Sequence, residues 1–74
     1  MSATVDITIP VYNEEEVLPR TIKALTEFLA SNLTNPWQVT IADNASNDGT
    51  QAVSEMLCRQ YPGVNYLRIP QKGR

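Results

Sequence analysis

Histidine is absent from this 74-residue chain, and cysteine occurs only once, at Cys58. A lone cysteine excludes a disulfide framework within the chain and favours a cytoplasmic setting. Because no histidine is present to activate the thiol as a nucleophile, we interpret Cys58 as a small residue on the core side of a helix.

Charge is also sparse, with six Lys and Arg residues against eight Asp and Glu residues and a net charge of -2. No basic patch is long enough to follow a phosphate backbone, so we expect no nucleic acid partner. No apolar run approaches the roughly 20 residues that span a bilayer. Met1 leads into a short polar segment and a predicted strand without the basic and apolar regions of a secretory signal. We therefore expect a cytoplasmic protein.

Glycine is missing where a dinucleotide-binding fold would need it. The chain has three glycines, and none lies between the first predicted strand and the first predicted helix. The GxGxxG fingerprint must sit at that point, so this type of dinucleotide site is disfavoured.

Strand and helix signals alternate along the chain, whose hydrophobic content of 42% argues against disorder. Residues 5–10, 37–43 and 64–69 predict strands rich in β-branched and aromatic residues. Two amphipathic helices are predicted between them, the first beginning close to Pro19 and the second following Gly49. The apolar face of the first would consist of Val17, Leu18, Ile22, Leu25, Phe28 and Leu29. That of the second would consist of Ala52, Val53, Met56, Leu57 and Tyr61.

This order predicts an α/β fold, the β-α-β-α-β half of a Rossmann-like parallel sheet with three strands and two helices. Two successive right-handed crossovers in one direction would place both helices on one face of the sheet. The other face would then be bare, and the first strand would be an open edge. The chain stops at Arg74, soon after the third strand, so we expect residues 1–74 to be one partial, truncated domain. A complete minimal domain is the alternative.

The first predicted strand ends in Pro10-Val11-Tyr12-Asn13-Glu14. The carboxyl end of a strand is where open α/β sheets bind ligands. Tyr12 is suited to stacking on a nucleobase, and Glu14 to accepting hydrogen bonds from ribose hydroxyls. Asn13 is also a good helix N-cap, and Glu16 completes a capping-box pattern with it.

Three consecutive glutamates, Glu14 to Glu16, suit the positive end of a helix dipole. A bare helix N-terminus attracts phosphate, whereas three carboxylates there would repel it. The sequence therefore predicts that a nucleotide places its base and ribose here, and that its diphosphate is neutralised elsewhere.

A second strand ends in Asp43-Asn44, about 30 residues later. The Asp43 carboxylate could accept a hydrogen bond from a base N–H, or it could be an ordinary strand-end turn residue. Ser46 or Asn47 is predicted to cap the second helix, and Asp48 to complement its dipole. At the end of the chain, Lys72 and Arg74 flank a glycine and could reach a diphosphate, or could simply be solvated.

These blocks resemble the glycosyltransferases of family 2, which have the GT-A fold. Residues 9–16 (IPVYNEEE) resemble the family's opening P-x-Y-N-E signature, and residues 41–50 (IADNASNDGT) resemble its second block, often V-D-D-G-S-x-D-G-T. Residues 72–74 resemble the start of the third block. Within the family, the chain looks most similar to polyprenyl- or dolichyl-phosphate sugar synthases and to related enzymes of glycan or cell-wall biogenesis.

The resemblance implies a nucleotide-diphospho-sugar partner, UDP- or GDP-linked, and transfer of the sugar to a lipid-phosphate or glycan acceptor. It implies that Pro10 and Tyr12 line the base pocket, Glu14 meets the ribose, Asp43 contacts the base, and Lys72 and Arg74 lie near the phosphates. The full set of nucleotide-binding residues that we predict is Pro10, Val11, Tyr12, Asn13, Glu14, Asp43, Asn44, Lys72 and Arg74.

Two features depart from the family pattern. Asn44 stands where the second block often has a second aspartate, which leaves the base preference open. The family's metal-binding D-x-D motif and its catalytic base lie beyond the third strand and do not occur here. We therefore predict no catalytic residue and no metal ligand in this chain, a sugar-transfer activity only in the full-length enzyme, and Mg²⁺ or Mn²⁺ as the cofactor there. That enzyme would act in the cytoplasm or at the cytoplasmic face of a membrane, which it would meet through other regions or through its acceptor.

Two alternatives remain. The chain could be a non-catalytic βαβαβ module that forms a homodimer through its open sheet edge. It could also be a receiver-like module with Asp43 as phospho-acceptor, although the first strand ends in Pro10-Val11-Tyr12 where receivers usually carry acidic residues.

Overall fold

The computed structural model describes residues 3–70, in which three strands and two helices alternate. Strand β1 spans Val5–Val11, helix α1 Leu18–Asn32, strand β2 Trp37–Asn44, helix α2 Thr50–Gln60 and strand β3 Val64–Ile69. The predicted β-α-β-α-β order is confirmed. Lys72 and Arg74 lie outside the described residues.

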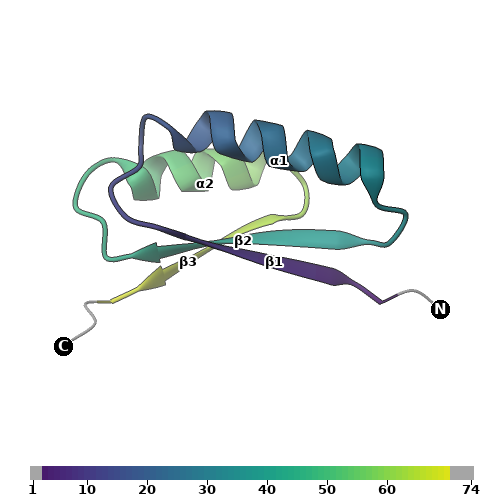
Figure 1. Cartoon of the computed structure of the whole chain (residues 1–74). Coiled ribbons are helices and arrows are strands. Elements are labelled where there is room, and N and C mark those ends of the chain that lie inside the picture. The colour runs from purple at the N-terminus through teal and green to yellow at the C-terminus, as the bar shows by residue number, and fades with distance from the viewer. Residues whose placement is uncertain (1–2, 71–74) are drawn as a thin grey trace.

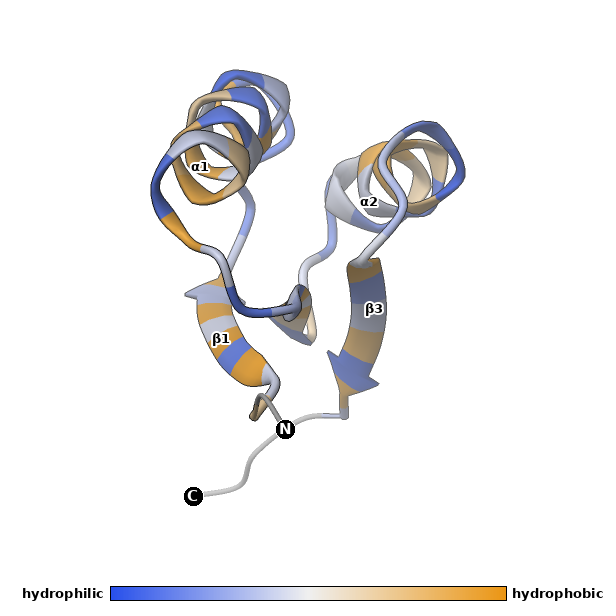
Figure 2. Cartoon of the chain, turned by 90° about the vertical axis from the view of Figure 1, so that its right-hand side faces the viewer, coloured by the Kyte–Doolittle hydropathy of each residue, from blue (hydrophilic) through white to orange (hydrophobic). Residues whose placement is uncertain are grey.

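The strands form one parallel sheet in the order β1-β2-β3, with β2 in the centre. Both helices lie against the same face, as the predicted crossovers require (Figure 1). Figure 2 shows the two resulting layers end-on, with α1 and α2 side by side above the sheet. Within the described residues, β1 pairs on one side only and is therefore an edge strand, also as predicted.

The core lies between the sheet and the two helices. Val39 and Ile41 of β2 are fully buried, and so are Leu18 and Ile22 of α1. Leu57 of α2 contributes from the second crossover with 2% of its surface exposed. Because β1 and β2 are parallel neighbours, the loops that follow them leave the sheet at the same end, and the buried core fixes the position of both strands.

The open face of the sheet is polar over its amino-terminal half. There Gln38 donates from Nε2 to Asp6 Oδ1 at 2.7 Å and accepts from Asn65 Nδ2 at 3.3 Å, so that one amide bridges all three strands. This ladder lets that half of the face meet water. Towards the carboxyl ends the same face is apolar, since Leu67 and Ile69 are exposed there.

Helix α1 begins at Leu18 with Pro19 in its first turn, as predicted from the tolerance of that turn for proline. Its predicted apolar face was too wide, however. Val17 is 49% exposed and Phe28 is 60% exposed, because their positions on the helical wheel lie well away from the Leu18–Ile22–Leu29 stripe that meets the sheet.

Helix α2 shows the same kind of difference. Leu57 is buried and Val53 is half-buried, but Ala52 and Met56, which were assigned to the same face, are exposed. The buried stripe is completed by two polar residues, Thr50 and Ser54. Cys58 is half-buried against the core, in agreement with its predicted place, and burial raises the pKa of its thiol, an effect that the nearby Glu55 carboxylate increases.

Among residues 3–70, neither helix has the combination of length and apolar character that crossing a membrane requires.

Candidate functional site

Two loops meet at the carboxyl end of the sheet, one between β1 and α1 and the other between β2 and α2. Asn13 of the first loop donates its backbone N–H to Ser46 Oγ at 2.8 Å. Its side-chain Oδ1 accepts from the backbone N–H of Asn47 at 2.9 Å. Asn13 has a φ of 50°, in the left-handed region that asparagine tolerates better than most residues. Asn13 therefore ties the loops together and does not cap α1, and the predicted capping box with Glu16 is wrong.

Three further hydrogen bonds join the same two loops. Glu14 donates its backbone N–H to Thr50 Oγ1 at 2.9 Å. Glu15 donates its own N–H to Asp48 Oδ2 over a longer 3.5 Å, and its carboxylate accepts from the Gly49 N–H at 2.8 Å. The acidic residues of the first loop thus bind the start of α2, where their charge complements the positive end of that helix.

The cap of α2 differs from the predicted one. Neither Ser46 nor Asn47 caps the helix, because both are engaged with Asn13. The backbone N–H of Thr50 donates instead to Asp48 Oδ1 at 2.8 Å, and the Thr50 hydroxyl donates to the same oxygen. The Thr50 hydroxyl and the loop amides lower the pKa of the Asp48 carboxyl, against the smaller opposing effect of desolvation.

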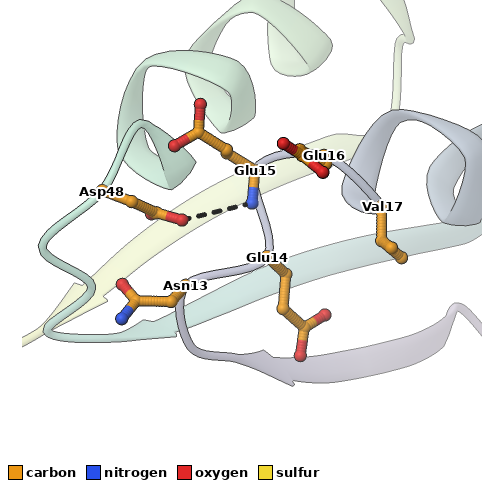
Figure 3. Close-up of a pocket in the computed structure, with 6 residues that line it drawn as sticks. All are labelled: Asn13, Glu14, Glu15, Glu16, Val17 and Asp48. Atoms are coloured by element: carbon orange, nitrogen blue, oxygen red, sulfur yellow. Dashed lines mark hydrogen bonds between the residues drawn. The ribbon is translucent and has the colours of Figure 1, made fainter.

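A pocket of about 610 Å³ opens over these loops (Figure 3). It is lined by Asn13, Glu14, Glu15, Glu16, Val17 and Asp48. In Figure 3 the Glu15 carboxylate lies beside Asp48, whereas that of Glu14 points away from both. Four carboxylates around one pocket repel a phosphate group and favour neutral hydroxyls or cations.

The carboxylates of the pocket do not form a metal centre. Within residues 3–70 no three Asp, Glu or Cys side chains are arranged to hold an ion. Asp48 and Glu15 already accept hydrogen bonds from the loop backbone. The described residues therefore do not fit a divalent cation.

Asp43, at the end of β2, is fully buried and has both carboxylate oxygens occupied. Oδ1 accepts from the Ser46 N–H at 3.0 Å, and Oδ2 accepts from Tyr66 Oη at 2.6 Å and from Arg68 Nη1 at 3.4 Å. Burial by itself would raise the pKa of this carboxyl, but the hydrogen bonds from Ser46 and Tyr66 and the charge of Arg68 outweigh it and lower the pKa.

The other predicted site residues differ in how accessible they are. Tyr12, which precedes the pocket residue Asn13 in the chain, is 54% exposed, and Pro10 and Asn44 are exposed at the ends of β1 and β2. Val11 is 3% exposed and belongs to the core, so only its backbone is left to face a ligand. Pro10 and Asn44 are thus accessible to a ligand at the carboxyl edge of the sheet, whereas the buried Asp43 is not.

Four residues that organise the site were not predicted for it, namely Ser46, Thr50, Tyr66 and Arg68. Ser46 does so by accepting a hydrogen bond from Asn13. The two on β3 meet Asp43 because the register places Arg68 beside it. A sequence signal existed only in the alternation of β3, which puts Val64, Tyr66 and Arg68 on one face of the strand.

The known proteins to which this chain is similar here are glycosyltransferases. The family model described as glycosyl transferase family 2 matches residues 6–74. The dolichyl-phosphate beta-glucosyltransferase ALG5A of Trichomonas vaginalis is 27% identical over 73 residues, a match that covers 93% of this chain and 23% of that protein.

A similar solved structure is the mannosyltransferase PcManGT from Pyrobaculum calidifontis, in complex with GDP-Man and Mn²⁺. It superposes on this chain with a TM-score of 0.71 and a sequence identity of 21%. The match covers the whole of this chain and 21% of the mannosyltransferase chain, and it shows a similar fold. The chain thus spans less than a quarter of the relatives it matches. With a family model that covers residues 6–74, the chain belongs to glycosyltransferase family 2.

Proposed function

We propose that this chain is the nucleotide-diphospho-sugar-binding part of a glycosyltransferase. The observation that carries the proposal is an exposed aromatic ring, Tyr12, that directly precedes the residues of an acidic pocket at the carboxyl end of a parallel sheet. The ring suits the face of a base, and the Glu14 carboxylate suits ribose hydroxyls. The mannosyltransferase of similar fold, which was solved with GDP-Man and Mn²⁺, supports a guanine nucleotide.

The diphosphate would lie away from the acidic pocket, because Glu14, Glu15, Glu16 and Asp48 repel it. Lys72 and Arg74 are the proposed phosphate contacts. In the full-length enzyme a divalent cation would neutralise the diphosphate, held by residues other than those described here. A carboxylate base outside this chain would activate a lipid-phosphate or glycan acceptor, whose attack releases the nucleoside diphosphate. We propose that residues 1–74 alone bind nucleotide without transferring sugar.

At the base, Asn44 takes the place predicted for Asp43. The Asp43 carboxylate is saturated by Ser46, Tyr66 and Arg68, whereas the neighbouring Asn44 is exposed. An amide both donates and accepts, so Asn44 can pair with either a guanine or a uracil edge. We propose Asn44 as the group that meets the base, with Asp43 supporting the loop beneath it.

Calorimetric titration with GDP and UDP, with and without Mn²⁺, tests the proposal. We expect weak binding at millimolar nucleotide and little effect of Mn²⁺. Tyr12→Ala should weaken binding by about fivefold or more, the usual cost of a lost stacking contact, and Tyr12→Phe should retain most of it. Phe28→Ala, which removes an equally exposed ring from α1, is the matched control. No heat from either nucleotide would reject the proposal.

A second function, self-association, is favoured by a different observation. Strand β1 has one neighbour within the described residues, and Val17 and Phe28 of the adjoining segment and helix are exposed. An unpaired parallel edge can add a strand from a second copy. Sedimentation equilibrium at rising concentration should then show a dimer that Phe28→Asp weakens, and a monomer throughout would exclude this function.

A further inference from the structure

Arg68 closes a ring of hydrogen bonds at the end of β3. Its Nη1 lies 3.4 Å from Asp43 Oδ2, and its Nη2 donates to the Ser46 carbonyl at 3.1 Å. Asp43 Oδ1 in turn accepts from the Ser46 N–H at 3.0 Å. One guanidinium therefore holds both a buried carboxylate and the backbone of the residue that this carboxylate binds.

Tyr66 also lies on β3, on the same face as Arg68, and joins this ring of hydrogen bonds. Its hydroxyl donates to Asp43 Oδ2 at 2.6 Å. With this bond and the bond from Ser46 in place, each oxygen of the buried Asp43 carboxylate has a strong donor. The carboxylate is thereby fixed in one orientation, since rotation would break a hydrogen bond to a side chain that is itself fully buried.

The ring extends to the β1–α1 loop through Ser46. The backbone of Ser46 belongs to the ring, and its side-chain Oγ accepts from the Asn13 N–H at 2.8 Å. Ser46 is 4% exposed, so its hydroxyl has little water with which to replace that bond. Asn13 has a φ of 50°, a conformation that surrounding contacts must maintain. Tyr12 directly precedes Asn13, so the segment that carries the tyrosine is anchored at Asn13.

We propose that Arg68 and Tyr66 are positioning residues of the nucleotide site. They act through Asp43 and Ser46 on Asn13, and so hold the loop that presents Tyr12, without touching the nucleotide themselves. Arginine suits this role because its planar fork serves the Asp43 carboxylate and the Ser46 carbonyl together, whereas one lysine ammonium serves a single acceptor well. The consequence for nucleotide affinity depends on the proposed function, but the coupling to Asn13 does not.

Amide hydrogen exchange tests the coupling without any nucleotide. In Arg68→Ala, we expect the Asn13 amide to exchange about fivefold to tenfold faster, in line with the loss of one typical hydrogen bond, with the α1 amides unchanged. In Arg68→Lys the Asn13 exchange rate should lie between those of the wild type and Arg68→Ala. This variant also provides a test if Arg68→Ala does not fold. Arg59→Ala, at the exposed end of α2, is the charge-matched control. An Asn13 exchange rate that stays at the wild-type value in Arg68→Ala and Arg68→Lys overturns the proposal.

A double-mutant cycle with GDP titration tests the route. We expect Ser46→Ala and Arg68→Ala each to weaken GDP binding, and the double variant to be no weaker than the weaker single, because both remove one pathway. Effects that multiply would show that Arg68 acts independently of Ser46, and would overturn the proposal. If the wild-type chain binds neither GDP nor UDP, the proposed function fails, and hydrogen exchange alone decides whether Arg68 positions Asn13.

Discussion

The backbone N–H of Gly49 donates to the carboxylate of Glu15 at 2.8 Å, across two loops that are 34 residues apart. A side chain from the β1–α1 loop thus supplies a cap to α2. The approach is close, since a Cβ added at Gly49 would lie 2.9 Å from Glu15 Oε2. The φ of -82° at Gly49 is available to any residue, and the close atoms belong to the flexible end of Glu15, so a larger residue here would displace this carboxylate rather than strain the backbone.

Removing this cap should destabilise the fold. We expect Glu15→Ala to lower the free energy of unfolding by about 1 kcal/mol, the usual worth of a helix cap, and Glu15→Gln, which keeps an acceptor oxygen, to lower it less. Glu16→Ala is the control, because the Glu16 side chain lines the same pocket and accepts no hydrogen bond among residues 3–70. Urea unfolding measures all three, and equal losses for Glu15→Ala and Glu16→Ala would contradict the capping role.

Ala45 is the second residue with a left-handed backbone, at a φ of 56°. Its Cβ is unfavourable in that conformation, whereas glycine adopts it freely. We expect Ala45→Gly to raise the free energy of unfolding by about 1 kcal/mol. Ala30→Gly, at an exposed position inside α1, should lower it by about the same amount. A loss of stability in both variants would mean that Ala45 carries no strain.

Ser54 is buried at the centre of the α2 face, and its Oγ has no hydrogen-bond partner among the described residues. An unpaired buried hydroxyl is costly, and alanine is also the better helix former. Ser54→Ala should therefore raise the free energy of unfolding by about 1 kcal/mol, against about 0.5 kcal/mol for the exposed Ser31→Ala. A destabilised Ser54→Ala variant would show that the hydroxyl has a partner.

Asp43 should make stability depend on pH in the acid range. Its pKa in the folded chain lies below the ordinary value of 3.8, so the unfolded chain takes up a proton first as the pH falls. The stabilisation is therefore complete above about pH 4 and is lost as the pH falls through the lowered pKa. Urea unfolding between pH 6 and about pH 2.5 measures the loss.

Tyr66→Phe provides the contrast in the same experiment. Without the phenol hydroxyl the pKa of Asp43 in the folded chain should rise towards that of the unfolded chain, so the variant should lose less stability than the wild-type chain over the same fall in pH. Tyr61→Phe is the matched control, because the Tyr61 hydroxyl makes no hydrogen bond among residues 3–70. Identical pH profiles for Tyr66→Phe and the wild type would remove the tyrosine from the account of Asp43.

The fold could be predicted because its signals are local. Period-two strands, period-3.6 helices and Pro19 near a helix start are all patterns within short windows of sequence. The candidate site was predicted in part for the same reason, since Tyr12 and Glu14 follow directly from the end of β1. The caps were predicted wrongly because each was sought within its own loop, whereas Asn13 and Glu15 bind partners in the other loop.

The alternation of strands and helices, the parallel sheet and the family could all be inferred from residue patterns, because hydrophobic period, turn residues and motif order are properties of neighbouring residues. Which polar groups meet became known from the folded chain alone. The register of β2 and β3 brings Arg68 and Tyr66 into contact with Asp43. The convergence of two loops allows Asn13 to donate a hydrogen bond to Ser46. Strand register and loop contacts depend on how the core packs, which short sequence patterns do not reveal. In the folded chain Asp43 is buried, whereas Tyr12 and Asn44 are exposed at the edge of the sheet.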